Sequence, residues 1–86
     1  MKIYYSSKFA REYKNLPLTI KKKAEKQEKI FRQNPFDSRL KTHKLSGSLK
    51  DFWAFSIDVK YRIIFEFIDE KTIWFHSVGD HSIYQI

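Results

Sequence analysis

Residues 53–67 read WAFSIDVKYRIIFEF, and bulky apolar side chains alternate with smaller or polar ones through most of this stretch. A period of two is typical of a β-strand with one buried face. The run Asp58-Val59-Lys60 interrupts the alternation and predicts a turn between two strands. A second turn at Asp69-Glu70-Lys71 leads into another apolar segment, residues 72–79. We therefore predict three consecutive strands in this part of the chain.

The two rows of side chains also predict how these strands are oriented. The bulkier row, which includes Phe55 and Phe65, should face the hydrophobic core. The other row, which includes Ala54, Ser56 and Arg62, is then left on the opposite face of the sheet. Arg62 is thus predicted to be exposed on an open sheet face.

Helical signals precede the strands. Residues 2–5 form a short β-type run, and Ser6 or Ser7 can cap the helix that follows it. Pro17 ends that helix and begins a second one. Asn34-Pro35 ends the second helix, because the residue before a proline is pushed out of the helical region.

The second predicted helix is amphipathic, which indicates that one of its faces packs on the core. Its lysine face is ordinarily a solvated surface, but a protein that binds RNA can also use such a face to contact phosphates. Residues 36–50 then read as a loop anchored by leucines. The core face of the helix contains Ile20, Ala24, Gln27 and Phe31, and the opposite face contains Lys22, Lys26 and Lys29.

These elements predict an α+β fold with the order β-α-α-β-β-β. The sheet is expected to be four-stranded and mainly antiparallel, with the first strand beside the C-terminal strands. The two-helix hairpin should pack on one face of the sheet. Because 86 residues suffice for only one hydrophobic core, residues 1–86 are predicted to form a single domain.

Composition narrows the class of protein. Eight Phe, five Tyr and two Trp can fill a core, and the absence of Cys excludes disulfides and thiolate metal sites. The net charge of +7 is uneven: residues 1–50 carry 14 Lys and Arg against 4 Asp and Glu, whereas residues 51–86 carry 3 against 6. This basic surface suggests a phosphate backbone or an acidic protein as partner.

No secretory signal or membrane span is visible, so we expect a cytoplasmic protein.

Several motifs in this order resemble the RelE/ParE superfamily of bacterial toxins over nearly the whole chain. They are the loop Leu45-Ser46-Gly47-Ser48-Leu49-Lys50, the strand Tyr61-Arg62-Ile63-Ile64-Phe65, and the closing segment from Val78-Gly79-Asp80-His81 to Tyr84. The pattern is most similar to the YafQ- and YoeB-like messenger-RNA endonucleases. The resemblance implies ribosome-dependent cleavage of mRNA, without a metal or cofactor, by attack of a ribose 2′-hydroxyl on the adjacent phosphate.

The resemblance also implies roles for individual residues. Arg62 matches the arginine that stabilises the phosphate, and Tyr84 matches a C-terminal tyrosine that stacks on or orients the substrate. His81 matches a tail position that carries His or Arg in different branches, and His43 falls where a YafQ-like histidine or a YoeB-like glutamate is found. Two imidazoles can share the base and acid duties of such a reaction. The expected contacts to RNA and ribosome come from Lys22, Lys26, Lys29, Lys44 and Lys50.

Each of these residues also has a simpler interpretation. Arg62 can form a surface ion pair with Glu66 on the same strand face. His81 can be a turn residue, His43 a solvated loop residue, and Tyr84 a core side chain that closes the C-terminus. The three histidines lack the spacing of zinc motifs, so no metal site is expected.

The sequence departs from the family pattern at three positions. Ala54 and Ser56 stand where RelE proper carries lysines, and Ser56 and Lys60 stand where YafQ-like proteins carry a histidine and an aspartate. The expected site is therefore sparser than in either branch, and the general base stays open.

Three functions are compatible with the sequence. The leading one is a toxin endonuclease that an acidic, partly disordered antitoxin neutralises. The alternatives are a ParE-like toxin that inhibits DNA gyrase without cleaving RNA, and a catalytically inactive family member that acts as a binding partner. The pair of histidines favours the nuclease, because a protein that only binds needs no groups that titrate near neutrality.

Overall fold

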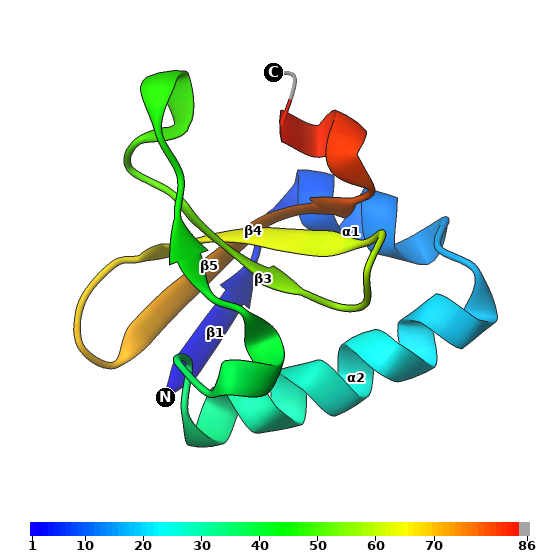
Figure 1. The fold of residues 1–86 in the computed structure, drawn as a ribbon, viewed down its shortest axis with the longest axis horizontal. Coiled ribbons are helices and arrows are strands. Elements are labelled where there is room, and N and C mark those ends of the chain that lie inside the picture. Colours follow the sequence, from blue (N-terminus) through cyan, green and yellow to red (C-terminus); the bar gives the residue numbers. More distant parts are fainter. Residues whose placement is uncertain (85–86) are drawn as a thin grey trace.

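The computed structural model describes residues 1–84 as a mixed five-stranded sheet, two α-helices and three short 3-10 helices (η) (Figure 1). The strands lie in the order β1-β5-β4-β3-β2. β1 pairs with β5 in parallel, and the other neighbouring strands are antiparallel. The elements are β1 (Lys2–Tyr5), α1 (Ser7–Lys14), α2 (Leu18–Gln33), η1 (Ser38–Leu40), β2 (His43–Lys44), η2 (Gly47–Leu49), β3 (Trp53–Ser56), β4 (Arg62–Phe67), β5 (Thr72–Gly79) and η3 (His81–Tyr84).

The α+β class and the order of the predicted elements are confirmed, but the strand count is wrong. The predicted loop contains the additional strand β2, which pairs with β3 through His43 and Ala54. A strand of two residues is too short to show a period of two, so the sequence pattern does not reveal it. The sheet is therefore five-stranded and mixed.

The helices begin and end where the local signals predict. Ser6 caps α1, because its hydroxyl oxygen accepts a hydrogen bond from the backbone N–H of Phe9 at 2.9 Å. Pro17 stands immediately before α2, and Asn34 ends it with extended backbone angles. The loop that follows is anchored by Leu40, whose side chain is fully buried.

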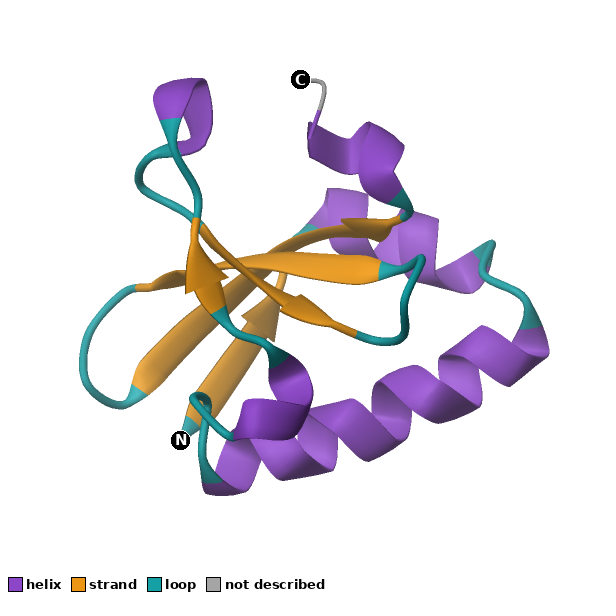
Figure 2. Ribbon diagram, in the orientation of Figure 1, coloured by secondary structure: helices purple, strands orange, loops and turns teal. Residues whose placement is uncertain are grey.

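The core lies between the helices and one face of the sheet (Figure 2). The ring of Phe31 in α2 lies 4.9 Å from that of Phe55 in β3 and 5.0 Å from that of Phe65 in β4. Phe9 brings α1 onto β5 by packing against Phe75, with ring centroids 5.5 Å apart. The prediction that Phe65 faces the helices is confirmed. No helix in residues 1–84 has the length and hydropathy needed to cross a membrane.

The second face of the sheet is more covered than predicted. Ala54 is fully buried and Ser56 nearly so, although the alternation predicts an open face for both. Arg62 is half-buried there, so the prediction of an exposed arginine is also wrong. The segments that carry η2 and η3 rise on the side of the sheet opposite α2 (Figure 1), and residues of both segments line one hollow together with Arg62.

Candidate functional site

A groove of about 400 Å³ lies between the η2 segment, β4 and η3. All four side chains that the sequence predicts to be catalytic line this groove, although 41 positions separate His43 from Tyr84. A permanent cation, two imidazoles and a phenol thereby share one hollow. Such a set can bind an anion and exchange protons with it. The lining residues are His43, Leu45, Ser46, Ser48, Leu49, Arg62, His81 and Tyr84.

Arg62 is held at the first position of β4. Its neighbours across the sheet are Ser56 in β3 and Gly79 in β5, and both are too small to cover the guanidinium. Nη1 donates hydrogen bonds to the backbone carbonyl oxygens of Asp58 at 2.5 Å and of Tyr61 at 3.0 Å. One edge of the guanidinium is thus bound to the turn, and within residues 1–84 its other N–H groups have no protein acceptor.

The predicted alternative for Arg62 is an ion pair with Glu66. Within the described part of the chain, the ion pairs involve other residues. The guanidinium instead lines the groove and a neighbouring hollow of about 290 Å³, which also contains Arg39 and Lys41. Arg62 therefore separates two adjoining hollows and is a wall of each.

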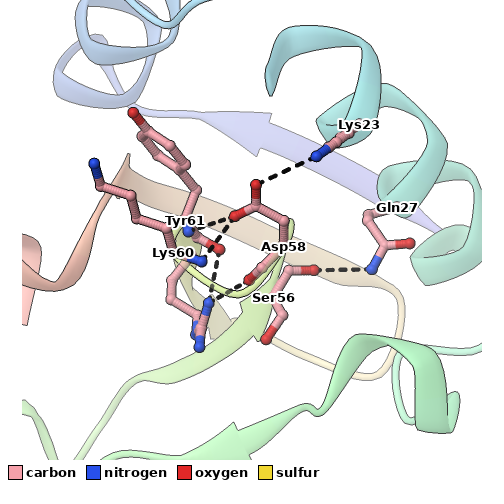
Figure 3. A network of polar contacts seen from close by, with 7 residues as sticks. Lys23, Gln27, Ser56, Asp58, Lys60 and Tyr61 are labelled. Atoms are coloured by element: carbon pink, nitrogen blue, oxygen red, sulfur yellow. Dashed lines mark hydrogen bonds and ion pairs between the residues drawn. The ribbon is translucent and has the colours of Figure 1, made fainter. Parts of the chain in front are cut away.

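The turn that holds Arg62 is ordered by Asp58 (Figure 3). One carboxylate oxygen accepts hydrogen bonds from the backbone N–H groups of Lys60 at 2.9 Å and Tyr61 at 2.8 Å, and the other lies 3.6 Å from the Lys23 ammonium. Partial burial opposes ionisation, but these hydrogen bonds and the Lys23 charge lower the pKa of Asp58 below its usual value. Gln27 connects the same region to α2, because its amide donates to the carbonyl of Ser56 at 2.9 Å.

His43 enters the groove from β2. Its backbone pairs with Ala54 of β3, and its ring nitrogen Nδ1 lies 3.0 Å from the carbonyl oxygen of Lys41. The side chain is otherwise exposed. The interpretation of His43 as a solvated loop residue is therefore incomplete, since both its backbone and its ring are held.

His81 and Tyr84 come from η3, which follows β5 after Gly79 and Asp80. The Asp80 side chain accepts a hydrogen bond from the backbone N–H of Ser82 at 2.9 Å, which starts the 3-10 turn. The rings of His81 and Tyr84 lie 6.2 Å apart. Burial raises the pKa of Tyr84, and the nearby positive charge of Arg62 partly offsets this effect. Tyr84 is half-buried beside the groove and does not belong to the main core.

The predicted binding lysines do not line the groove. All five are exposed. Those of α2 lie on the opposite side of the sheet from η2 and η3 (Figure 1), whereas Lys44 and Lys50 belong to the segment that borders the groove. The two sets, Lys22, Lys26 and Lys29 on α2 and Lys44 and Lys50 near η2, are therefore separate surfaces.

A larger hollow of about 640 Å³ lies between α1 and α2 and contains none of the predicted catalytic residues. Apolar side chains such as Phe9 and Ala24 line much of it. Part of its charged rim is already paired, because Glu28 accepts hydrogen bonds from Tyr5 at 2.9 Å and from Arg32. Size favours the hollow between α1 and α2. The groove at Arg62, however, combines a guanidinium that is only partly hydrogen-bonded within residues 1–84 with two imidazoles and a phenol, so we place the candidate site there.

Sequence reasoning missed part of the site. Ser46 and Ser48 line the groove, and the polar Ser-Gly-Ser run in their loop was a usable signal. The role of Asp58 was also readable, because an aspartate at the start of a turn commonly accepts hydrogen bonds from backbone N–H groups two or three positions later. Within residues 1–84, no group of three or more His, Cys, Asp or Glu side chains is arranged to hold a metal ion.

No protein-family model and no curated protein sequence matches this chain. Solved structures do. YafQ from Escherichia coli strain BL21(DE3) superposes with a TM-score of 0.75 at 21% identity, covering 96% of each chain. A YoeB/ParE toxin from Agrobacterium tumefaciens gives 0.78 at 15% identity, with 94% of this chain and 99% of that chain covered.

A complex of YoeB with YefM from Staphylococcus aureus also matches, with a TM-score of 0.76 at 21% identity and coverage of 94% of this chain and 97% of that chain. At these identities the agreement concerns the path of the backbone over nearly the full length of both chains. The chain therefore shares the fold of the YafQ and YoeB toxins over nearly its full length, and this is the fold that the sequence resemblance implies.

Proposed function

We propose that this chain is the toxin of a bacterial toxin–antitoxin module and that it cleaves messenger RNA on the ribosome. The observation that carries the proposal is the groove, which brings Arg62, His43, His81 and Tyr84 together. The fold shared with YafQ and YoeB toxins supports the same assignment. A protein that only binds gyrase or an antitoxin has no use for two imidazoles beside a free guanidinium edge.

The proposed reaction is an internal transfer at one phosphate of the RNA. A base removes the proton from the ribose 2′-hydroxyl, and the 2′-oxygen forms a bond to phosphorus. The bond from phosphorus to the 5′-oxygen of the next nucleotide then breaks, and an acid gives that oxygen a proton. Atoms and charge balance without a metal, a cofactor or an attacking water.

Each groove residue has a role in this reaction. The free edge of Arg62 donates hydrogen bonds to the phosphate and stabilises the additional negative charge of the transition state. His43 and His81 transfer the two protons. Tyr84 stacks on a base or orients the ribose beside the scissile phosphate. Because Ala54 and Ser56 replace the lysines of RelE proper and are buried, these strand positions add no charge, and the histidines carry the proton transfers.

The proposed partner in the silent state is an acidic antitoxin. YafQ has been solved with DinJ and YoeB with YefM as toxin–antitoxin complexes. The charge distribution of this chain supports an analogous partner, because the excess of Lys and Arg lies in residues 1–50. A disordered acidic segment can fold onto such a surface. The exposed lysines of α2 and those near η2 then serve antitoxin, ribosome and RNA at different times.

The test is induced expression followed by primer extension on cellular mRNA, with gyrase supercoiling assayed in parallel. We expect cleavage that depends on translation and leaves gyrase unaffected. In a purified system whose ribosomes stay intact, cleavage should survive EDTA and leave a 2′,3′-cyclic or 3′-phosphate and a free 5′-hydroxyl. Products with a 5′-phosphate would show attack by an activated water and would contradict the proposal.

A further inference from the structure

Lys41 has an unusual backbone conformation, with φ 53° and ψ 39°. Within residues 1–84 it is the only non-glycine residue with a positive φ. Side chains with a Cβ avoid this left-handed region, and asparagine and glycine are the residues that usually occupy it. The neighbouring structure must therefore impose the conformation on Lys41.

The constraint comes from the 3-10 helix η1. Asp37 starts this helix by accepting a hydrogen bond from the backbone N–H of Arg39 at 2.9 Å, and Leu40 anchors it in the core with no exposed surface. The backbone N–H of Lys41 donates to the carbonyl of Ser38 at 3.3 Å. Lys41 thus ends a helix that is fixed at both ends, and its carbonyl direction is set by that frame.

The carbonyl oxygen of Lys41 lies 3.0 Å from Nδ1 of His43. A carbonyl oxygen only accepts hydrogen bonds, so this contact requires the hydrogen of the neutral imidazole to be on Nδ1. Nε2 then carries the lone pair. Because the Lys41 carbonyl engages Nδ1 and His43 lines the groove, Nε2 is the ring nitrogen left to interact with a group bound in the groove.

We infer that Lys41 is a positioning residue whose left-handed backbone sets the tautomer of His43, so that His43 accepts the proton of the 2′-hydroxyl. His81 is then left to protonate the departing 5′-oxygen. This inference rests on the proposed function, because it assigns the direction of proton transfer in the same groove. The backbone of Lys41, and not its ammonium group, determines the tautomer of His43.

Variants of the full-length protein separate the two contributions of Lys41. Lys41→Gly and Lys41→Asn remove the ammonium but tolerate a positive φ, whereas Lys41→Val also removes the ammonium and strongly disfavours it. Comparing Lys41→Val with Lys41→Gly therefore tests backbone conformation at constant charge. If Lys41→Val does not fold, Lys41→Ala replaces it as the variant that penalises the left-handed region.

The first measurement is the ¹⁵N NMR spectrum of the His43 ring, recorded at a pH at which the ring is neutral. We expect the Nδ1–H tautomer in the parent protein, Lys41→Gly and Lys41→Asn, and a shift toward Nε2–H in Lys41→Val. The second measurement is single-turnover cleavage on ribosomes programmed with mRNA. Lys41→Val should lose at least about tenfold more activity than Lys41→Gly, as part of the roughly 10²–10⁴ that a positioned base contributes.

A parent protein whose His43 ring is mainly in the Nε2–H tautomer would overturn the inference. So would equal tautomer populations and equal cleavage rates in Lys41→Val and Lys41→Gly. The NMR measurement needs neither ribosomes nor activity. Complete absence of cleavage would thus contradict the proposed function, whereas the tautomer populations would still test the role of Lys41 by themselves.

Discussion

Arg62 lies directly opposite Gly79 in the antiparallel pairing of β4 with β5. A Cβ atom at position 79 would lie 2.5 Å from Cγ2 of Ile83, so with isoleucine at position 83 any side chain at position 79 would force Ile83 or η3 to move. Gly79 thus leaves the Arg62 guanidinium uncovered. It also lets η3 bring His81 and Tyr84 beside Arg62. A glycine in a strand often marks such a close approach.

Gly79→Ala should therefore displace η3 while the core remains folded. Because a displacement of about 1 Å in a catalytic group can cost roughly 10²-fold in rate, we expect a loss of that order in mRNA cleavage. Thermal unfolding should stay cooperative. The matched control is Gly79→Ala combined with Ile83→Ala, which removes the clashing Cγ2 and should recover most of the activity. If the double variant restores no cleavage, displacement of η3 is not the cause of the activity lost in Gly79→Ala.

Asp58 is expected to act on catalysis through the turn that holds Arg62. Asp58→Ala removes the acceptor of the Lys60 and Tyr61 N–H groups and should lower both cleavage and the free energy of unfolding, the latter by about 1 kcal/mol. Asp58→Asn keeps an acceptor oxygen but loses the ion pair with Lys23 and the charge that strengthens the two hydrogen bonds, so it should lose clearly less stability and activity than Asp58→Ala. Denaturant unfolding and cleavage rates check both variants, and equal losses in the two would contradict this account.

The fold was predictable where the signal is local. The cap at Ser6, the break at Pro17 and the helix end at Asn34 all depend on the geometry of adjacent residues. β2 was not predictable, because two residues show no period. The burial of Ala54 was also hidden, because small side chains opposite a bulky row read as an exposed face, and whether another segment covers that face depends on the tertiary structure.

The candidate site was predictable in its chemistry but not in its assembly. The resemblance supplied Arg62, His43, His81 and Tyr84, and the structure places all of them around one groove. Their roles stay predictions. The backbone of Lys41 gave no sequence signal, because a lysine does not indicate a positive φ as glycine or asparagine does.

The lysines of α2 should affect ribosome binding without affecting the chemical step. Replacing Lys22, Lys26 and Lys29 by Glu should change stability by no more than about 0.5 kcal/mol each, because all three are exposed. The affinity for ribosomes should fall, and the slope of log affinity against log salt should flatten by about two to three units. At saturating ribosome concentration the cleavage rate should be unchanged, since α2 lies across the sheet from the groove. Unaltered affinity would mean that this face is only solvated.

His76 should make the stability of the fold depend on pH. Burial, together with the positive charge of Lys8, lowers the pKa of His76 below its usual 6.5, and its ring packs 5.0 Å from Phe52 and 5.3 Å from Trp74. The unfolded chain therefore binds a proton more readily than the folded one, so stability is complete above pH 6.5 and declines as pH falls toward the folded-state value. The lowered pKa values of the aspartates affect stability only at more acidic pH, below about pH 5.

His76→Phe keeps a ring between Phe52 and Trp74 and removes the titration. Urea unfolding between about pH 7 and 5 should show a smaller decline in unfolding free energy for this variant than for the parent. The test is whether the unfolding free energy of the parent falls more steeply toward low pH than that of His76→Phe. A histidine stabilised in its charged form would give the opposite sign, because it would make the parent more stable at low pH. An identical pH dependence in the two proteins would assign the decline to other groups.

The last prediction concerns Arg62 and separates its charge from its geometry. Arg62→Lys retains a positive charge, but one ammonium cannot both bind the carbonyls of Asp58 and Tyr61 and present a second planar edge to a phosphate. We therefore expect Arg62→Lys to lose nearly as much cleavage as Arg62→Ala, roughly 10²–10³-fold in each case. His81→Ala should lose cleavage by a similar factor, and all three should still bind antitoxin. Single-turnover cleavage on programmed ribosomes, with antitoxin binding by calorimetry as the control for folding, checks these values. Near-parental activity of Arg62→Lys would show that charge alone suffices, and parental cleavage by His81→Ala would transfer the acid step to another proton donor in the groove.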